Sequence, residues 1–129
     1  MDDHLHIAIA DDDAVCREFL FFVLRRMGHD VVCVAETGRQ LADYCLQSPP
    51  DLVITDVHMP ELDGISAAAE ITRQYDVPIV LLSGSDLPMR VELLHHAHVV
   101  ARRVKPISRH DLEAVVAEVM TPSAAAAAV

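Results

Sequence analysis

The chain has 129 residues, 52% of them hydrophobic, which suffices for one compact domain and excludes native disorder. Its 20 Asp and Glu outnumber its 10 Lys and Arg, and a formal charge of −10 argues against a general nucleic-acid binder, which needs a basic face. No apolar run approaches the ~20 residues of a membrane span, and the start lacks a signal-peptide pattern. We therefore expect a cytoplasmic protein, with Cys16, Cys33 and Cys45 as reduced thiols packed in the core.

Five short apolar runs along the chain are predicted to be strands. They are rich in Val and Ile and lack a clean alternation of apolar and polar residues, which is typical of strands buried on both faces of a parallel sheet. The last run is the least regular, because two arginines interrupt it. In chain order the runs are residues 6–10, 31–35, 52–55, 79–83 and 99–104.

Segments of helical period follow each of these runs. The first is expected to end at Gly28, and Thr37, Asp86 and Ser108 are the predicted caps of the second, fourth and fifth. Asp111 lies three residues after Ser108, which resembles a capping box. The apolar positions that recur at helical spacing are Val15, Phe19, Phe22, Val23 and Leu24, then Leu41, Tyr44 and Cys45, then Ile65, Ala68 and Ala69, then Leu87, Val91 and Leu94, and finally Leu112, Val115, Val116 and Val119.

Strict alternation of strand and helix predicts an α/β fold, a doubly wound five-stranded parallel sheet with helices on both faces. We expect one domain over residues 1–121, and we assign no function to the Ala-rich, low-complexity tail at 122–129. Ligands of such sheets bind at the carboxyl ends of the strands. The residues that directly follow each run are therefore the candidates for chemistry.

Polar side chains follow four of the five predicted strands. Asp11, Asp12 and Asp13 come after the first, Asp56 after the third, Ser83 closes the fourth, and Lys105 follows the fifth. Exposed strand ends are commonly polar, but that alone does not explain carboxylates, a hydroxyl and an ammonium at these particular strands. Carboxylates gathered in one cleft need a cation, and hard oxygen ligands favour Mg²⁺ or a similar ion.

The hydroxyl and the ammonium would complete the surroundings of a phosphoryl group. One carboxylate could then act as a nucleophile and form an acyl phosphate.

Four stretches, IAIADDDAVCR, DLVITDVHMPELDG, VPIVLLSGS and VKP, together resemble the receiver domain of two-component response regulators. The resemblance covers about residues 6–120. It implies a flavodoxin-like (βα)₅ fold with strand order 2-1-3-4-5, a Mg²⁺ cofactor that Mn²⁺ could replace, and phosphorelay signalling instead of classical enzyme activity. It also implies a sensor histidine kinase or phosphotransfer protein as partner, with a downstream protein or a second copy of the chain as the target.

The same resemblance assigns roles to single residues. Asp56 matches the phosphoacceptor, and Asp11 and Asp12 match the acidic pair, with Asp12 as the more direct metal ligand. The backbone carbonyl of His58 matches a further metal ligand. Ser83 matches the switch hydroxyl, and Lys105 matches the lysine that contacts the phosphoryl group and precedes a cis proline. Asp13 is expected to cap the first helix instead of binding metal.

Two departures from the family pattern lie close to the fifth strand. Arg102 stands where many receivers carry a Tyr or Phe that swings inward, and His98 and Val99 replace a small Gly-Ala pair. Burying a charged guanidinium without a partner is costly, so we expect Arg102 to stay at the surface. The surface of the fourth helix, fifth strand and fifth helix, which would switch on phosphorylation, is accordingly predicted to be unusual.

Three other interpretations remain. A phosphatase with an aspartyl nucleophile usually carries a covering insertion, for which this chain has no room. A degenerate receiver would bind partners without phosphorylation, but the acidic pair, Asp56, Ser83 and Lys105 are all intact. A zinc site at His95, His96 and His98 lacks further ligands nearby, so solvated histidines are the better account.

Overall fold

The computed structural model describes residues 4–84 and 98–120. Five strands form one parallel sheet in the order β2-β1-β3-β4-β5, which confirms the predicted fold. The strands are β1 (His6–Ala10), β2 (Asp30–Ala35), β3 (Leu52–Asp56), β4 (Ile79–Ser83) and β5 (Val99–Val104). The described helices are α1 (Ala14–Arg26), α2 (Gly38–Gln47), α3 (Gly64–Thr72) and α5 (Arg109–Met120).

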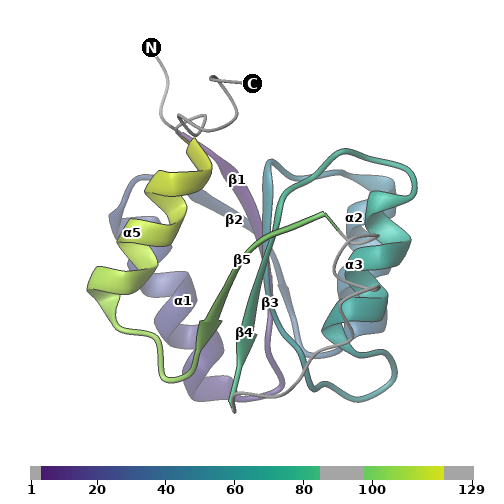
Figure 1. Ribbon diagram of the computed structural model, residues 1–129, viewed down its shortest axis with the longest axis horizontal. Coiled ribbons are helices and arrows are strands. Elements are labelled where there is room, and N and C mark those ends of the chain that lie inside the picture. Colours follow the sequence, from purple (N-terminus) through teal and green to yellow (C-terminus); the bar gives the residue numbers. More distant parts are fainter. Residues whose placement is uncertain (1–3, 85–97, 121–129) are drawn as a thin grey trace.

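The helices cover both faces of the sheet and create two separate cores. Helices α1 and α5 lie on one face, and α2 and α3 lie on the other (Figure 1). Because side chains alternate along a strand, Ile7 and Ile9 of β1 pack toward α1 and α5, whereas Ala8 and Ala10 pack toward α2 and α3. The central strands are thus buried on both faces, which explains their continuous apolar sequence.

The helix ends follow the predicted signals. The carboxylate of Asp13 accepts a hydrogen bond from the backbone N–H of Val15 at 3.0 Å, and the Thr37 hydroxyl accepts one from Gln40 at 3.1 Å. Gly28 follows the end of α1 with a φ of 95°, a left-handed conformation that favours glycine. The Ser108 hydroxyl likewise accepts from the backbone N–H of Asp111 at 3.0 Å.

Strand β5 lies at the edge of the sheet, and its side chains alternate between partly buried and exposed. An edge strand tolerates charge on its outer face, so the two arginines are compatible with a strand. His98, just before β5, adopts a left-handed φ of 49°, and its Nδ1 lies 3.0 Å from Oδ1 of Asp76.

The structure also differs from the sequence-based expectation. Strand β2 begins one residue earlier than predicted, at Asp30, because the backbone N–H of Asp30 donates to the carbonyl of Leu5 at 2.9 Å. Val15 and Phe22 have the predicted helical spacing but are 72% and 60% exposed, so the buried stripe of α1 does not include them.

Several predicted features lie outside the described residues. They are the fourth helix with Asp86, Leu87, Val91 and Leu94, the histidines His95 and His96, and the tail at 122–129. None of the helices within residues 4–84 and 98–120 is long and apolar enough to cross a membrane.

Candidate functional site

The carboxyl ends of the strands bring the predicted acidic residues together. Asp11 and Asp12 directly follow β1, and Asp56 is the last residue of the neighbouring strand β3. One carboxylate oxygen from each of the three lies within 4.8 Å of the others. Asp56, which is 44 positions after Asp12 in the sequence, thus forms one oxygen-rich cluster with Asp11 and Asp12.

Lys105 links two of these carboxylates. Its ammonium lies 2.9 Å from Oδ2 of Asp11 and 3.4 Å from Oδ2 of Asp56. The cis Lys105–Pro106 peptide bond, which the resemblance implied, is present directly after this side chain. The backbone N–H of Lys105 donates to the carbonyl of Ser83 at 2.6 Å, which fixes the loop after β5 against the end of β4.

Backbone groups orient both buried carboxylates. Oδ1 of Asp11 accepts from the N–H of Asp13 at 2.9 Å, and Oδ1 of Asp56 accepts from the N–H of Val57 at 2.8 Å. The N–H of Gly64 donates to the carbonyl of Val57 at 2.7 Å, and a Cβ at Gly64 would collide with the carbonyl of Asp56. A glycine is therefore required where the loop after β3 returns against the acceptor strand.

The charges in the cluster are strongly coupled. Burial and the neighbouring Asp11 carboxylate raise the pKa of Asp56 above its usual value, although Lys105 opposes this. Burial lowers the pKa of Lys105, but the hydrogen bond and charge of Asp11, together with Asp56, raise it above its usual range. Three carboxylates against one ammonium leave an excess of negative charge, and a divalent cation bound by oxygen atoms would balance it.

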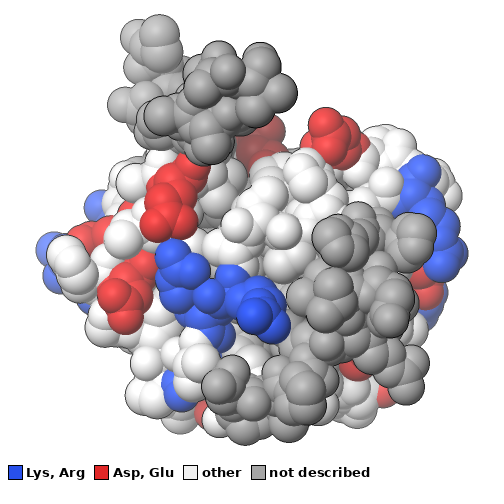
Figure 2. Space-filling model, in the orientation of Figure 1, with Lys and Arg blue, Asp and Glu red and all other residues white. Residues whose placement is uncertain are grey.

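The other predicted site residues differ in their exposure to solvent. Asp12 is exposed, as a ligand that meets a cation from solvent should be, and His58 is exposed in the loop after β3. Ser83 is buried at the end of β4, and Arg102 is exposed on β5. Lys and Arg side chains gather over β5 beside acidic side chains toward α5 (Figure 2), where Arg103 pairs with Glu118 at 3.3 Å.

The cysteines occupy three different environments. Cys45 is fully buried in the core, and burial raises the pKa of its thiol to about 12, so its packing role is confirmed. Cys33 is partly buried, and burial raises its thiol pKa to about 11. Cys16 does not lie in the core, since it is half-buried in the wall of a pocket beside the site, with its Sγ 3.6 Å from Oδ2 of Asp13.

That pocket has a volume of about 280 Å³ and opens beside Lys105. Its lining is mainly apolar and comes from the start of α1, the end of β4 and the loop after β5, with Val15, Phe19, Leu82 and Ile107 among its residues. The pocket borders the acidic cluster and could hold an apolar side chain.

Sequence reasoning missed the contribution of Arg17. Its guanidinium donates to the backbone carbonyl of Asp11 at 2.8 Å and lies 3.7 Å from the carboxylate of Glu36. The arginine thus holds the end of β1 to the loop after β2. Arg17 lies one turn into α1, and no sequence pattern indicates its contact with Asp11, because that contact forms only once α1 packs beside β1.

The family model of the response regulator receiver domain matches residues 7–117, and the chain belongs to this family of two-component signalling domains. Phosphorylation of an aspartate and dependence on Mg²⁺ are general properties of such domains, and the acidic cluster fits an ion of this kind. As a receiver domain it is a signalling domain and not a classical enzyme.

Individual relatives support this assignment. The transcriptional regulatory protein PdtaR of Mycobacterium tuberculosis is 40% identical over 106 residues, which are 82% of this chain and 52% of PdtaR. The chain therefore spans about half the length of that relative. Two solved structures share the fold: a LuxR-family response regulator from Staphylococcus aureus (TM-score 0.82, 20% identity, 91% of this chain and 99% of that one) and the receiver domain of Francisella response regulator 1452 (0.79, 26%, 90% and 96%).

Proposed function

We propose that Asp56 is the phosphoacceptor of this receiver and that it takes its phosphoryl group from a histidine kinase or a phosphotransfer protein in the cytoplasm. The observation that carries the proposal is the position of its carboxylate. Asp56 is buried at the end of β3, its Oδ2 lies 3.4 Å from the Lys105 ammonium, and it shares the cluster with buried Asp11 and exposed Asp12.

The proposed reaction is a phosphoryl transfer between two side chains. An oxygen of Asp56 attacks phosphorus, the bond from phosphorus to the donor's imidazole nitrogen breaks, and an acyl phosphate forms on Asp56. Attack needs the ionised carboxylate, and the ammonium of Lys105 favours that form against the burial and the negative charge of Asp11. In the product, Lys105 is placed to pair with a phosphoryl oxygen.

The metal would be held by Asp11, Asp12, Asp56 and the backbone carbonyl of His58. When bound, Mg²⁺ would neutralise charge on the phosphoryl oxygens. Asp12 is the exposed member of the cluster and would be the first to bind an ion that arrives from solvent. Asp11 is fully buried and accepts hydrogen bonds from the backbone N–H of Asp13 and the ammonium of Lys105.

The donor is proposed to approach over the start of α1. Val15 is 72% exposed there, and the apolar pocket that it lines opens beside Lys105. An apolar side chain of the donor could occupy this pocket while its phosphohistidine reaches Asp56. Burial of such an anchor is a common source of interface affinity.

The output is proposed to begin at Ser83. A phosphoryl oxygen on Asp56 would accept a hydrogen bond from the Ser83 hydroxyl, which lies at the end of the adjacent strand. The resulting movement of Ser83 would alter the surface of β5, α5 and the predicted fourth helix, which lies outside the described residues, and so control a partner protein or a second copy of the chain. Exposed Arg102 would act there as a contact residue instead of an internal plug.

Labelling with acetyl phosphate tests the proposal. Intact-mass spectrometry of the parent in Mg²⁺ should show one added phosphoryl group, and chelation of Mg²⁺ should abolish it. Asp56→Ala should not be labelled, and Asp12→Ala should lose most Mg²⁺-dependent labelling. Equal labelling of Asp56→Ala would refute the assignment, and no labelling of the folded parent would favour a degenerate receiver.

A further inference from the structure

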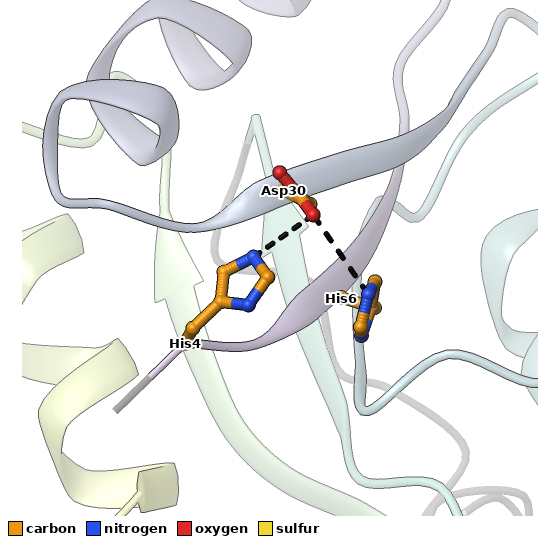
Figure 3. A group of neighbouring side chains, drawn as sticks. All are labelled: His4, His6 and Asp30. Carbon is orange, nitrogen blue, oxygen red and sulfur yellow. Dashed lines mark ion pairs between the residues drawn. The ribbon is translucent and has the colours of Figure 1, made fainter. Parts of the chain in front are cut away.

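A second cluster of metal-ligating side chains lies at the opposite edge of the sheet. The amino ends of β1 and β2 are neighbours because the strands are parallel, and His6 pairs in register with Asp30. Figure 3 shows the rings of His4 and His6 on either side of the Asp30 carboxylate. This cluster lies at the amino end of β1 and the acidic site lies at its carboxyl end. Since β1 has five residues at about 3.3 Å each, the two clusters are about 16 Å apart.

The distances suit a small metal ion. Nε2 of His4 lies 2.9 Å from Oδ2 of Asp30, and Nε2 of His6 lies 3.8 Å from the same oxygen. One ligand atom from each of the three residues lies within 4.8 Å of the others. A tetrahedral Zn²⁺ with bonds of about 2.0–2.1 Å places its ligand atoms about 3.3 Å apart, between the two observed separations.

Asp51 determines which nitrogen of His6 is available. Its Oδ2 lies 3.3 Å from Nδ1 of His6 and also accepts the backbone N–H of His6 at 2.8 Å. When the Nδ1 proton is donated to Asp51, the lone pair of Nε2 faces the Asp30 carboxylate. Two electron-rich atoms that face each other need a proton or a cation between them, and a carboxylate behind a histidine is the usual outer partner of a metal-binding imidazole.

The backbone around the cluster is held in place. The N–H of Asp30 donates to the carbonyl of Leu5 at 2.9 Å, and the N–H of Asp51 donates to the carbonyl of His6 at 2.7 Å. The N–H of Leu5 donates to Nδ1 of buried His29 at 3.1 Å. Three chain segments are thus joined before any ion binds, so little ordering is needed on binding.

We propose that His4, His6 and Asp30 bind a divalent transition-metal ion, with Zn²⁺ as the preferred cation and Asp51 as the outer partner. Two imidazoles and one carboxylate favour zinc over Mg²⁺, which prefers oxygen atoms. The three side chains are 32% to 58% exposed, so the ion is reachable from solvent and a water can complete its coordination. The ion joins the start of β1 to the start of β2 and stabilises the folded state by linkage.

Calorimetric titration of the chelator-treated chain with Zn²⁺ tests the site, with saturating Mg²⁺ present to occupy the acidic cluster. The parent and Asp12→Asn are expected to bind one Zn²⁺ with equal affinity. His6→Gln and Asp30→Asn should lose this binding, and Asp51→Asn should weaken it about 10- to 100-fold. His110→Gln removes an exposed histidine of α5 and is the matched control.

Two further readouts separate metal binding from a folding defect. Zn²⁺ should raise the melting temperature of the parent and of His110→Gln but not that of His6→Gln, whose melting temperature without metal should match the parent. Co²⁺ should give the visible absorption of a low-coordinate site in the parent and in His110→Gln but not in His6→Gln. Equal Zn²⁺ affinity in parent and His6→Gln, or no Zn²⁺ binding by the parent in Mg²⁺, would overturn the proposal.

Discussion

Replacement of Lys105 by Met removes one charge from the acidic cluster while keeping an unbranched side chain of similar length. The Lys105 ammonium lies 2.9 Å from Oδ2 of Asp11, whose side chain is fully buried. A buried carboxylate that loses the cation paired with it is costly, by about 3–5 kcal/mol for a fully buried pair. Lys105 keeps 17% exposure, so we expect a loss of about 3 kcal/mol in the metal-free protein.

The same substitution should strengthen Mg²⁺ binding. In the parent, a metal that uses Oδ2 of Asp11 must displace a charge-assisted hydrogen bond, which contributes about 1.5–3 kcal/mol. The variant has no such bond to displace. Its Mg²⁺ affinity should therefore rise about 10- to 100-fold, since 1.4 kcal/mol corresponds to a factor of ten.

Calorimetric Mg²⁺ titrations and thermal melts of the parent, Lys105→Met and Arg103→Met measure both effects. Arg103→Met removes the same charge two residues before Lys105, but Arg103 lies on β5 and pairs with Glu118 outside the cluster, so the Mg²⁺ affinity of this variant should equal that of the parent. Unchanged or weaker Mg²⁺ binding by Lys105→Met, with the control as expected, would refute competition between the ammonium and the metal.

Three further predictions concern residues at and near the carboxyl ends of the strands, where the candidate site lies. Because the pKa of Asp56 is raised in the folded state, the protonated carboxyl favours folding, and this stabilisation is lost as the pH rises through that pKa. In metal-free buffer at pH 7, Asp56→Asn should therefore have a higher melting temperature than the parent, and the difference should shrink as the pH falls toward 3.8. A difference in melting temperature that grows on acidification would contradict this direction of the pKa shift. Asp13→Ala should lose the α1 cap and about 1 kcal/mol of unfolding free energy in urea melts while phosphorylation persists, and loss of labelling would make Asp13 a metal ligand instead. In a structure with beryllofluoride, compared with one without it, Ser83 should turn toward Asp56 while Arg102 stays exposed. An Arg102 that becomes buried and pairs with an acidic group on activation would contradict this and show that it swings inward as the family's aromatic residue does.

The sequence predicted the five strands, the caps of α1, α2 and α5, and the carboxyl ends of the strands as the place where the candidate site forms, whereas it did not indicate Asp63 as the cap of α3. Apolar runs, Asp13, Thr37 and Ser108 are local signals, and parallel strands bring their carboxyl ends to one edge whatever the details of packing. The sequence did not predict that β2 begins at Asp30, because Asp30 is polar and belongs to the strand only through its backbone hydrogen bond to the carbonyl of Leu5.

Other features depend on the tertiary fold and gave no local signal. Arg17 reaches the carbonyl of Asp11 only once α1 packs beside β1, and the collision that requires glycine at position 64 exists only when the loop after β3 returns to Asp56. Strand pairing brings together His4, His6 and Asp30, which are distant in the sequence. The histidines that are close in sequence, His95 and His98, were therefore the ones considered as a metal site. Helical spacing likewise placed exposed Val15 with buried Val23.

Trapping the acyl phosphate with borohydride tests the central claim most directly. Reduction after acetyl phosphate treatment in Mg²⁺ converts a phosphorylated aspartate to homoserine, and peptide sequencing by mass spectrometry locates the changed residue. Homoserine should appear at position 56 alone and only when both Mg²⁺ and acetyl phosphate are present. Homoserine at Asp11, Asp12 or Asp13, or an Asp56 that stays unmodified while the chain is phosphorylated, would contradict the proposed role of Asp56.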